Sequence, residues 1–62
     1  MPFVTIKIIE GRTREQKRNM VRDVTDAVAK NIGCQAQSVH VDIIEYKQEN
    51  IGVGGKLICD TQ

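Results

Sequence analysis

The residue with the most distinctive chemistry in this sequence is Pro2, which directly follows the initiator methionine. Initiator methionine is normally removed when the next residue is small, and proline qualifies, so the mature chain would begin with a secondary amine. An α-amino group titrates at about 7.7–8.0, and apolar surroundings or a nearby cation lower that value. A neutral amine can remove a proton next to a carbonyl group. Pro2 is therefore a candidate general base, although many proteins begin with Met-Pro.

Few other residues offer catalytic chemistry. The chain has one histidine, His40, and two cysteines, Cys34 and Cys59, with no CxxC pair and no zinc-ligand spacing. We expect no metal site. A Cys-His nucleophile or a thiol redox pair is an alternative that a close cysteine pair in the structure would support. The glycines of 52–56 lack phosphate-loop spacing, and Leu57 stands where such a loop has Ser or Thr, so they predict tight turns instead.

Two strands are predicted to hold these residues in place. Apolar side chains alternate from Phe3 to Ile9 and again from Ser38 to Tyr46. A helix between them makes a βαβ unit, in which the two strands run parallel with a right-handed crossover. Residues 50–58 contain three glycines and predict a short C-terminal hairpin. The predicted fold class is α+β.

The intervening helix has clear start and stop signals. Thr13 and Gln16 have the spacing of a capping box, and Gly33 is placed to end the helix in a left-handed conformation. The helix is predicted from about Thr13 to Ile32. One apolar stripe recurs at helical spacing: Met20, Val21, Val24, Ala27 and Val28.

Size and composition limit the partners. A chain of 62 residues is one domain, 1–62, and is too short to bury a substantial core alone, so oligomerisation is the favoured support. Nine basic and eight acidic residues are mixed along the chain, and only Phe3 and Tyr46 are aromatic. This composition argues against nucleic acid as a partner. With no targeting segment or long apolar run, we expect no membrane partner and a cytoplasmic location.

Several of these features occur together. The chain opens with Met1-Pro2 leading directly into a strand, continues with Glu10-Gly-Arg-Thr13 and Glu15-Gln-Lys17, and ends with Gly52-Val-Gly-Gly55. From Pro2 to about Leu57 it resembles the 4-oxalocrotonate tautomerase family. The resemblance implies a tautomerase fold, with βαβ protomers in a hexamer built as a trimer of dimers and active sites near subunit boundaries. It also implies no metal or organic cofactor, and a proline that moves a proton within a conjugated enol acid.

The resemblance assigns roles to further residues. Arg12 matches the arginine that binds a substrate carboxylate in this family and draws electron density toward it. Without the resemblance, Arg12 would be interpreted as a solvated residue before a helix cap. His40 stands where well-known members carry a second arginine from another subunit, and a strand histidine at a subunit contact is the alternative. Ile51 stands where those members have an aromatic pocket residue. Both departures make dicarboxylate specificity doubtful, because neutral histidine lacks the charge and bidentate reach of arginine.

The expected function is that of a cofactor-free tautomerase, an intramolecular oxidoreductase that interconverts keto and enol groups. Its expected substrates are 2-hydroxymuconate-like dienols or related enol acids, and its expected assembly is a homohexamer. Pro2 and Arg12 are the expected catalytic residues, and His40 and Ile51 the expected substrate-binding residues. The alternative is a non-catalytic oligomeric binding or scaffold protein with the same fold, which retention of Met1 would favour.

Overall fold

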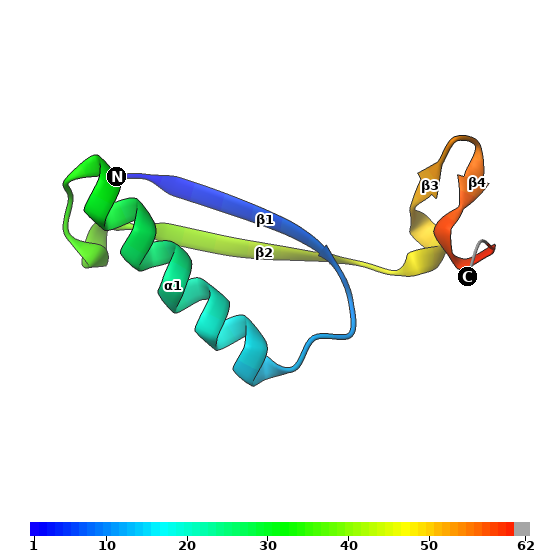
Figure 1. The fold of residues 1–62 in the computed structure, drawn as a ribbon, viewed down its shortest axis with the longest axis horizontal. Coiled ribbons are helices and arrows are strands. Elements are labelled where there is room, and N and C mark those ends of the chain that lie inside the picture. The colour runs from blue at the N-terminus through cyan, green and yellow to red at the C-terminus, as the bar shows by residue number, and fades with distance from the viewer. Residues whose placement is uncertain (61–62) are drawn as a thin grey trace.

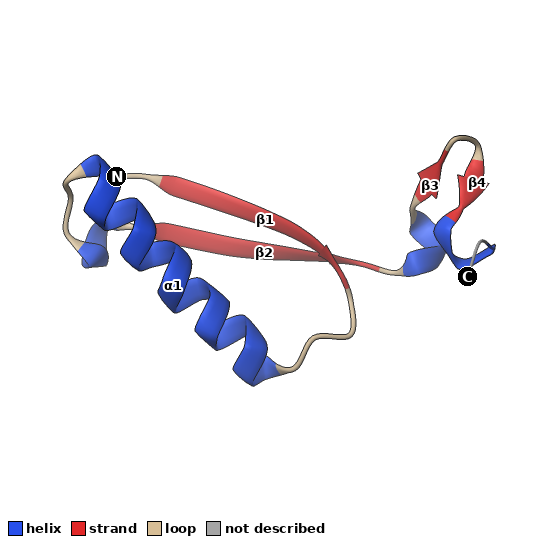
Figure 2. Ribbon diagram, in the orientation of Figure 1, coloured by secondary structure: helices blue, strands red, loops and turns tan. Residues whose placement is uncertain are grey.

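The computed structural model describes residues 1–60 of the chain, in which a strand, a long helix and a second strand are followed by a small hairpin (Figures 1 and 2). Short 3-10 helices, labelled η, separate the later elements. In chain order the elements are β1 (Phe3–Ile9), α1 (Arg14–Ile32), η1 (Ala36–Ser38), β2 (His40–Tyr46), η2 (Gln48–Asn50), β3 (Gly52–Val53), β4 (Lys56–Leu57) and η3 (Ile58–Asp60).

The main sheet consists of β1 and β2, which pair in parallel as predicted from the βαβ pattern. The register runs from Phe3 opposite His40 to Ile9 opposite Tyr46. The predicted start of the second strand at Ser38 was wrong by two residues, since β2 begins at His40. The cause is the 3-10 turn of η1, which the amide of Val39 closes by donating to the carbonyl of Ala36 at 3.1 Å.

Both ends of α1 follow the predicted capping chemistry. The Thr13 amide donates to Gln16 Oε1 at 2.9 Å, and the Gln16 amide donates to Thr13 Oγ1 at 3.1 Å. This reciprocal pair satisfies two amides that the helix itself leaves without partners. At the other end, Gly33 has φ 82° and its amide donates to Ala29 at 2.9 Å. The left-handed conformation that ends the helix is open to glycine at little steric cost.

The helix covers one face of the two-stranded sheet. Side chains of β1 alternate in exposure, and Ile8 lies with Lys17 and Met20 of α1 around one hollow. Within the predicted apolar stripe of the helix, Ala27 is exposed while the other four members are half-buried. The opposite face of the sheet has no helix over it, and Phe3 on that face is 75% exposed.

The C-terminal hairpin confirms the prediction made from the glycines. Gly54 and Gly55 both have positive φ, 63° and 86°, as a two-residue turn of type I′ requires. The amide of Ile58 donates to the carbonyl of Ile51 at 2.9 Å and closes the base of the hairpin. In Figure 1 the hairpin lies beyond the end of the main sheet, away from α1.

The protomer is more extended than a compact domain of its length. Its radius of gyration is 14.9 Å, whereas a compact chain of this length has about 11 Å. Its accessible surface is 4892 Å², against about 4,000 Å² for a folded monomer of this mass. Among residues 1–60 no side chain is fully buried. One protomer therefore lacks a closed core, as the short length predicted. No helix within the same residues combines the length and the apolar character needed to cross a membrane.

Candidate functional site

The start of β1 brings Pro2 and His40 together. The amide of His40 donates to the carbonyl oxygen of Pro2 at 3.0 Å, as the first rung of the parallel ladder. The ring of Phe3 stacks on the imidazole, with ring centroids 5.0 Å apart and planes inclined by 19°. Met1 is 76% exposed and Pro2 is half-buried. Removal of Met1 would leave a secondary amine at the start of the strand, next to the only histidine of the chain.

Arg12 lies on the connection between β1 and α1, one residue before the helix cap. It borders a hollow of about 220 Å³ whose wall is mainly apolar and includes the side chains of Ile8 and Met20. A second cation at this hollow, Lys17, is paired with Glu45, whereas Arg12 has no ion pair among residues 1–60. A carboxylate entering the hollow would therefore find the guanidinium available for a bidentate contact.

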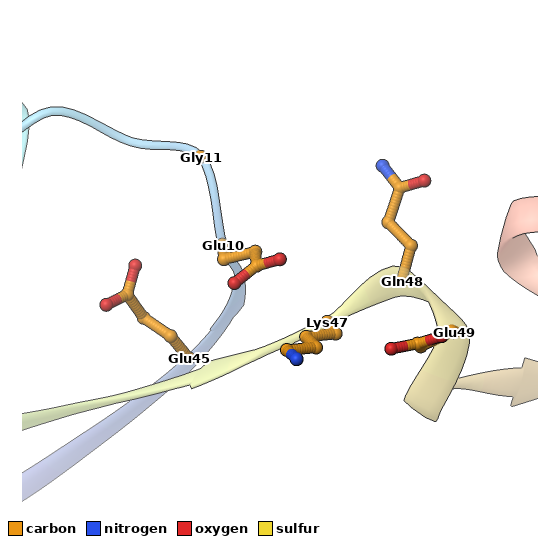
Figure 3. Close-up of a pocket in the computed structure, with 6 residues that line it drawn as sticks. All are labelled: Glu10, Gly11, Glu45, Lys47, Gln48 and Glu49. Atoms are coloured by element: carbon orange, nitrogen blue, oxygen red, sulfur yellow. The ribbon is translucent and has the colours of Figure 1, made fainter.

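A larger hollow, of about 670 Å³, lies where the two main strands end (Figure 3). It is lined by Glu10, Gly11, Glu45, Lys47, Gln48 and Glu49. Three carboxylates and one ammonium group line it; even with Glu45 paired to Lys17, the remaining charge is negative and disfavours an anionic substrate. None of the residues predicted for the site lines it. No three His, Cys, Asp or Glu side chains in the described part of the chain gather so that they could hold a metal ion.

The predicted site residues divide into two groups at opposite ends of the sheet. Pro2 and His40 lie where β1 and β2 begin, whereas Arg12 follows the end of β1 and Ile51 lies beyond the end of β2. β1 has seven residues, which at ~3.3 Å per residue is about 23 Å. That length far exceeds the reach of an arginine side chain. One chain therefore does not bring Pro2 and Arg12 together.

The two cysteines do not form a pair. Cys34 follows the glycine cap of α1, Cys59 lies in η3, and both are free thiols. In Figure 1 the C-terminal end of α1 and η3 lie at opposite ends of the molecule. The thiol redox alternative therefore finds no support within a protomer.

Comparison with known proteins identifies relatives over the full length of the chain. The family model described as "Tautomerase enzyme" matches residues 2–61. The 2-hydroxymuconate tautomerase of Bacillus subtilis is 44% identical over 62 residues, covering 100% of both chains. A probable tautomerase of Lactiplantibacillus plantarum is 47% identical, covering 100% of this chain and 97% of that protein.

Solved structures agree with these relatives. The crystal structure of YwhB, a homologue of 4-oxalocrotonate tautomerase, superposes with a TM-score of 0.93 at 43% identity, covering 98% of this chain and 100% of YwhB. A heterohexameric 4-oxalocrotonate tautomerase from Chloroflexus aurantiacus also has a TM-score of 0.93, at 27% identity and 100% coverage of both chains. The α+β fold with one helix and parallel strands is thus that of the tautomerases.

Proposed function

The chain belongs to the tautomerase enzyme family, and from this premise we propose that it is a cofactor-free keto–enol isomerase of 2-hydroxymuconate-like dienols or related enol acids. In this proposal the whole chain is one catalytic domain, and Pro2 is the general base. The observation that carries it is the position of Pro2 at the open start of β1, behind an exposed Met1. The 44% identity to the 2-hydroxymuconate tautomerase of Bacillus subtilis supports the substrate class.

The proposed reaction is a proton transfer in two steps. The neutral amine of Pro2 takes a proton from the enol hydroxyl, and the electron pair left behind delocalises over the conjugated acid as a dienolate. The ammonium group of Pro2 then returns the proton to a carbon of the dienolate, which yields the ketone and restores the neutral amine. The same residue serves as base and then as acid, so the enzyme is unchanged after one turnover.

Arg12 supplies the second element of the proposed mechanism. Its guanidinium binds the substrate carboxylate through two hydrogen bonds and favours the negative charge that develops as the proton leaves. Because β1 separates Pro2 from Arg12 in one chain, we propose that each site combines Pro2 of one subunit with Arg12 of a neighbour. The acidic charge of the larger hollow supports the same choice, because it leaves the Arg12 hollow as the better place for an anion.

A homohexamer is the proposed assembly. The open face of the sheet, the projecting hairpin and the excess surface of the protomer support association. A relative with the same fold is described as a heterohexamer. Within such an assembly we propose that His40 and Ile51 contact the substrate. We also propose the cytoplasm as the place of action, where the two free cysteines stay reduced.

One comparison tests the proposed function. The mature chain beginning at Pro2 and a chain carrying a fixed N-terminal extension are assayed for the ketonisation of 2-hydroxymuconate by ultraviolet absorbance. An extension converts the amine of Pro2 to an amide without a basic lone pair, so we expect activity in the mature chain alone. Intact mass verifies both N-termini, and light scattering verifies that both assemble. Equal rates in the two proteins would overturn the role of Pro2.

A further inference from the structure

The aromatic pair at the start of the main sheet has no role in the function proposed so far. Phe3 and His40 are directly opposite each other in the parallel register, and their rings stack at 5.0 Å. Phe3 is 75% exposed in the protomer. Within the protomer its ring is therefore held mainly by stacking on His40. The backbone amide of the same histidine is fixed to the carbonyl of Pro2. Pro2, Phe3 and His40 therefore form one connected unit.

We propose that Phe3 is a positioning residue, which holds the imidazole of His40 in the orientation that meets the oxygen atoms of a substrate bound at Pro2 of a neighbouring subunit. This inference rests on the proposed function. An exposed histidine on a strand has several staggered side-chain rotamers available to it. Stacking of two offset aromatic rings favours the rotamer that places the imidazole over Phe3.

A second side-chain pair lies next to the stacked rings on the same face of the sheet. Asp42 lies two residues after His40, so its side chain is on the same face of β2. Its Oδ1 accepts a hydrogen bond from Thr5 Oγ1 at 2.9 Å. Thr5 thus fixes the orientation of this carboxylate across the two strands, while the imidazole of His40 stacks on Phe3. The pairs Phe3–His40 and Thr5–Asp42 thus orient two consecutive side chains of the open face.

Orientation matters more for histidine at this position than it would for arginine. Neutral imidazole has one N–H donor and one acceptor, whereas guanidinium has five donors in a broad fork. A single donor must point at the substrate to be useful, while a fork tolerates some rotation. We therefore expect the contribution of Phe3 to depend on His40, and the two residues should show coupling in a double-mutant cycle.

The test uses the fact that the chain has one histidine and one phenylalanine. Stacking on Phe3 shifts the imidazole proton resonances of His40, and these can be assigned without ambiguity. We expect Phe3→Leu to move them toward free-histidine positions and to raise KM for an enol acid about 2- to 10-fold, the range that corresponds to loss of one aromatic pair, with a smaller change in kcat. Phe3→Tyr keeps a ring and should retain wild-type values. In the His40→Arg background, Phe3→Leu should have little effect on KM.

Controls separate positioning from folding. Ile44→Val trims the same open face away from His40 and should leave the resonances and KM unchanged, and light scattering verifies assembly of each variant. Unmoved imidazole resonances in Phe3→Leu would overturn the proposal, and so would moved resonances with an unchanged KM. If the wild-type protein ketonised no enol acid, the proposed function would fail, and the resonances alone would decide whether Phe3 orients the ring.

Discussion

The ammonium group of Lys17 lies 2.7 Å from Oε1 of Glu45, and the two side chains are only 30% and 35% exposed. This ion pair joins α1 to β2. It balances the positive charge of Lys17, which is one of the two cations that line the smaller hollow. Arg12 is the other, and it has no ion pair among residues 1–60. One cation of the hollow therefore makes an ion pair between the helix and the sheet, while the other stays available to an anion.

The first prediction follows from the difference between Lys17, which is paired, and Arg12, which is available to a substrate carboxylate. Arg12→Ala should lower kcat/KM for 2-hydroxymuconate about 100- to 1,000-fold, since it removes a group that stabilises developing charge. Arg14→Ala is the matched control, because Arg14 is an exposed arginine two residues away, at the start of α1. Steady-state kinetics measures both. A comparable loss in the two variants would mean that general electrostatics, and not Arg12, binds the carboxylate.

Pro2→Ala provides the second prediction. Alanine is also small enough for Met1 to be removed, so the variant begins with a primary amine whose position and basicity differ from those of proline. We expect kcat to fall about 100- to 10,000-fold, the usual contribution of a general base, while light scattering shows an intact oligomer. Wild-type kcat in this variant, with Met1 shown by mass to be absent, would contradict the assigned role.

The third prediction concerns assembly. A protomer with a radius of gyration of 14.9 Å and no buried side chain among residues 1–60 should fold only together with its partners. Its melting temperature should therefore rise with protein concentration, since association stabilises the folded state by mass action. Calorimetry at several concentrations, with light scattering for the mass, measures this. A monomer whose melting temperature is independent of concentration would contradict the hexamer.

The elements of the fold were predictable because their signals are local. The capping box at Thr13, the left-handed cap at Gly33 and the turn glycines each act within a few residues, and the structure has all three. The start of β2 was missed because η1 continues through Ser38, and alternation of polarity does not report a single 3-10 turn.

The contacts within the candidate site were less predictable, because they depend on the register between β1 and β2. The stacking of Phe3 on His40 joins residues far apart in the sequence, and only the parallel pairing of β1 with β2 brings them together. The same pairing gathers the carboxylates of the larger hollow. Aligning the two strands from their first residues would have placed Phe3 opposite His40. That alignment needs the correct start of β2 at His40, which the sequence pattern did not give.

The fourth prediction concerns the helix cap beside Arg12. Thr13→Ala removes the hydroxyl that accepts from the Gln16 amide and should lower the free energy of unfolding by about 0.5–2 kcal/mol. Because the cap fixes the start of α1 next to Arg12, we also expect a higher KM. Thr13→Ser keeps the hydroxyl and should restore both values. Denaturant unfolding and kinetics test this, and equal stability of the alanine and serine variants would show that the cap is not needed.

The fifth prediction concerns His40 and substrates with two carboxylates. A dicarboxylate brings two negative groups into a partly desolvated site, where each unpaired charge is costly. In the proposed mechanism Arg12 binds one of them, and a neutral imidazole could offer only one hydrogen bond to the other. We therefore expect His40→Arg to raise kcat/KM more for 2-hydroxymuconate than for a monocarboxylate enol such as that of phenylpyruvate. One added charge contact of about 1.5–3 kcal/mol corresponds to a roughly 10- to 100-fold difference between the two substrates.

Steady-state kinetics on both substrates, with light scattering to verify the oligomer, makes the comparison. If both substrates responded equally, His40 would not face the second carboxylate, and its place on the open face of the sheet would indicate a subunit contact instead.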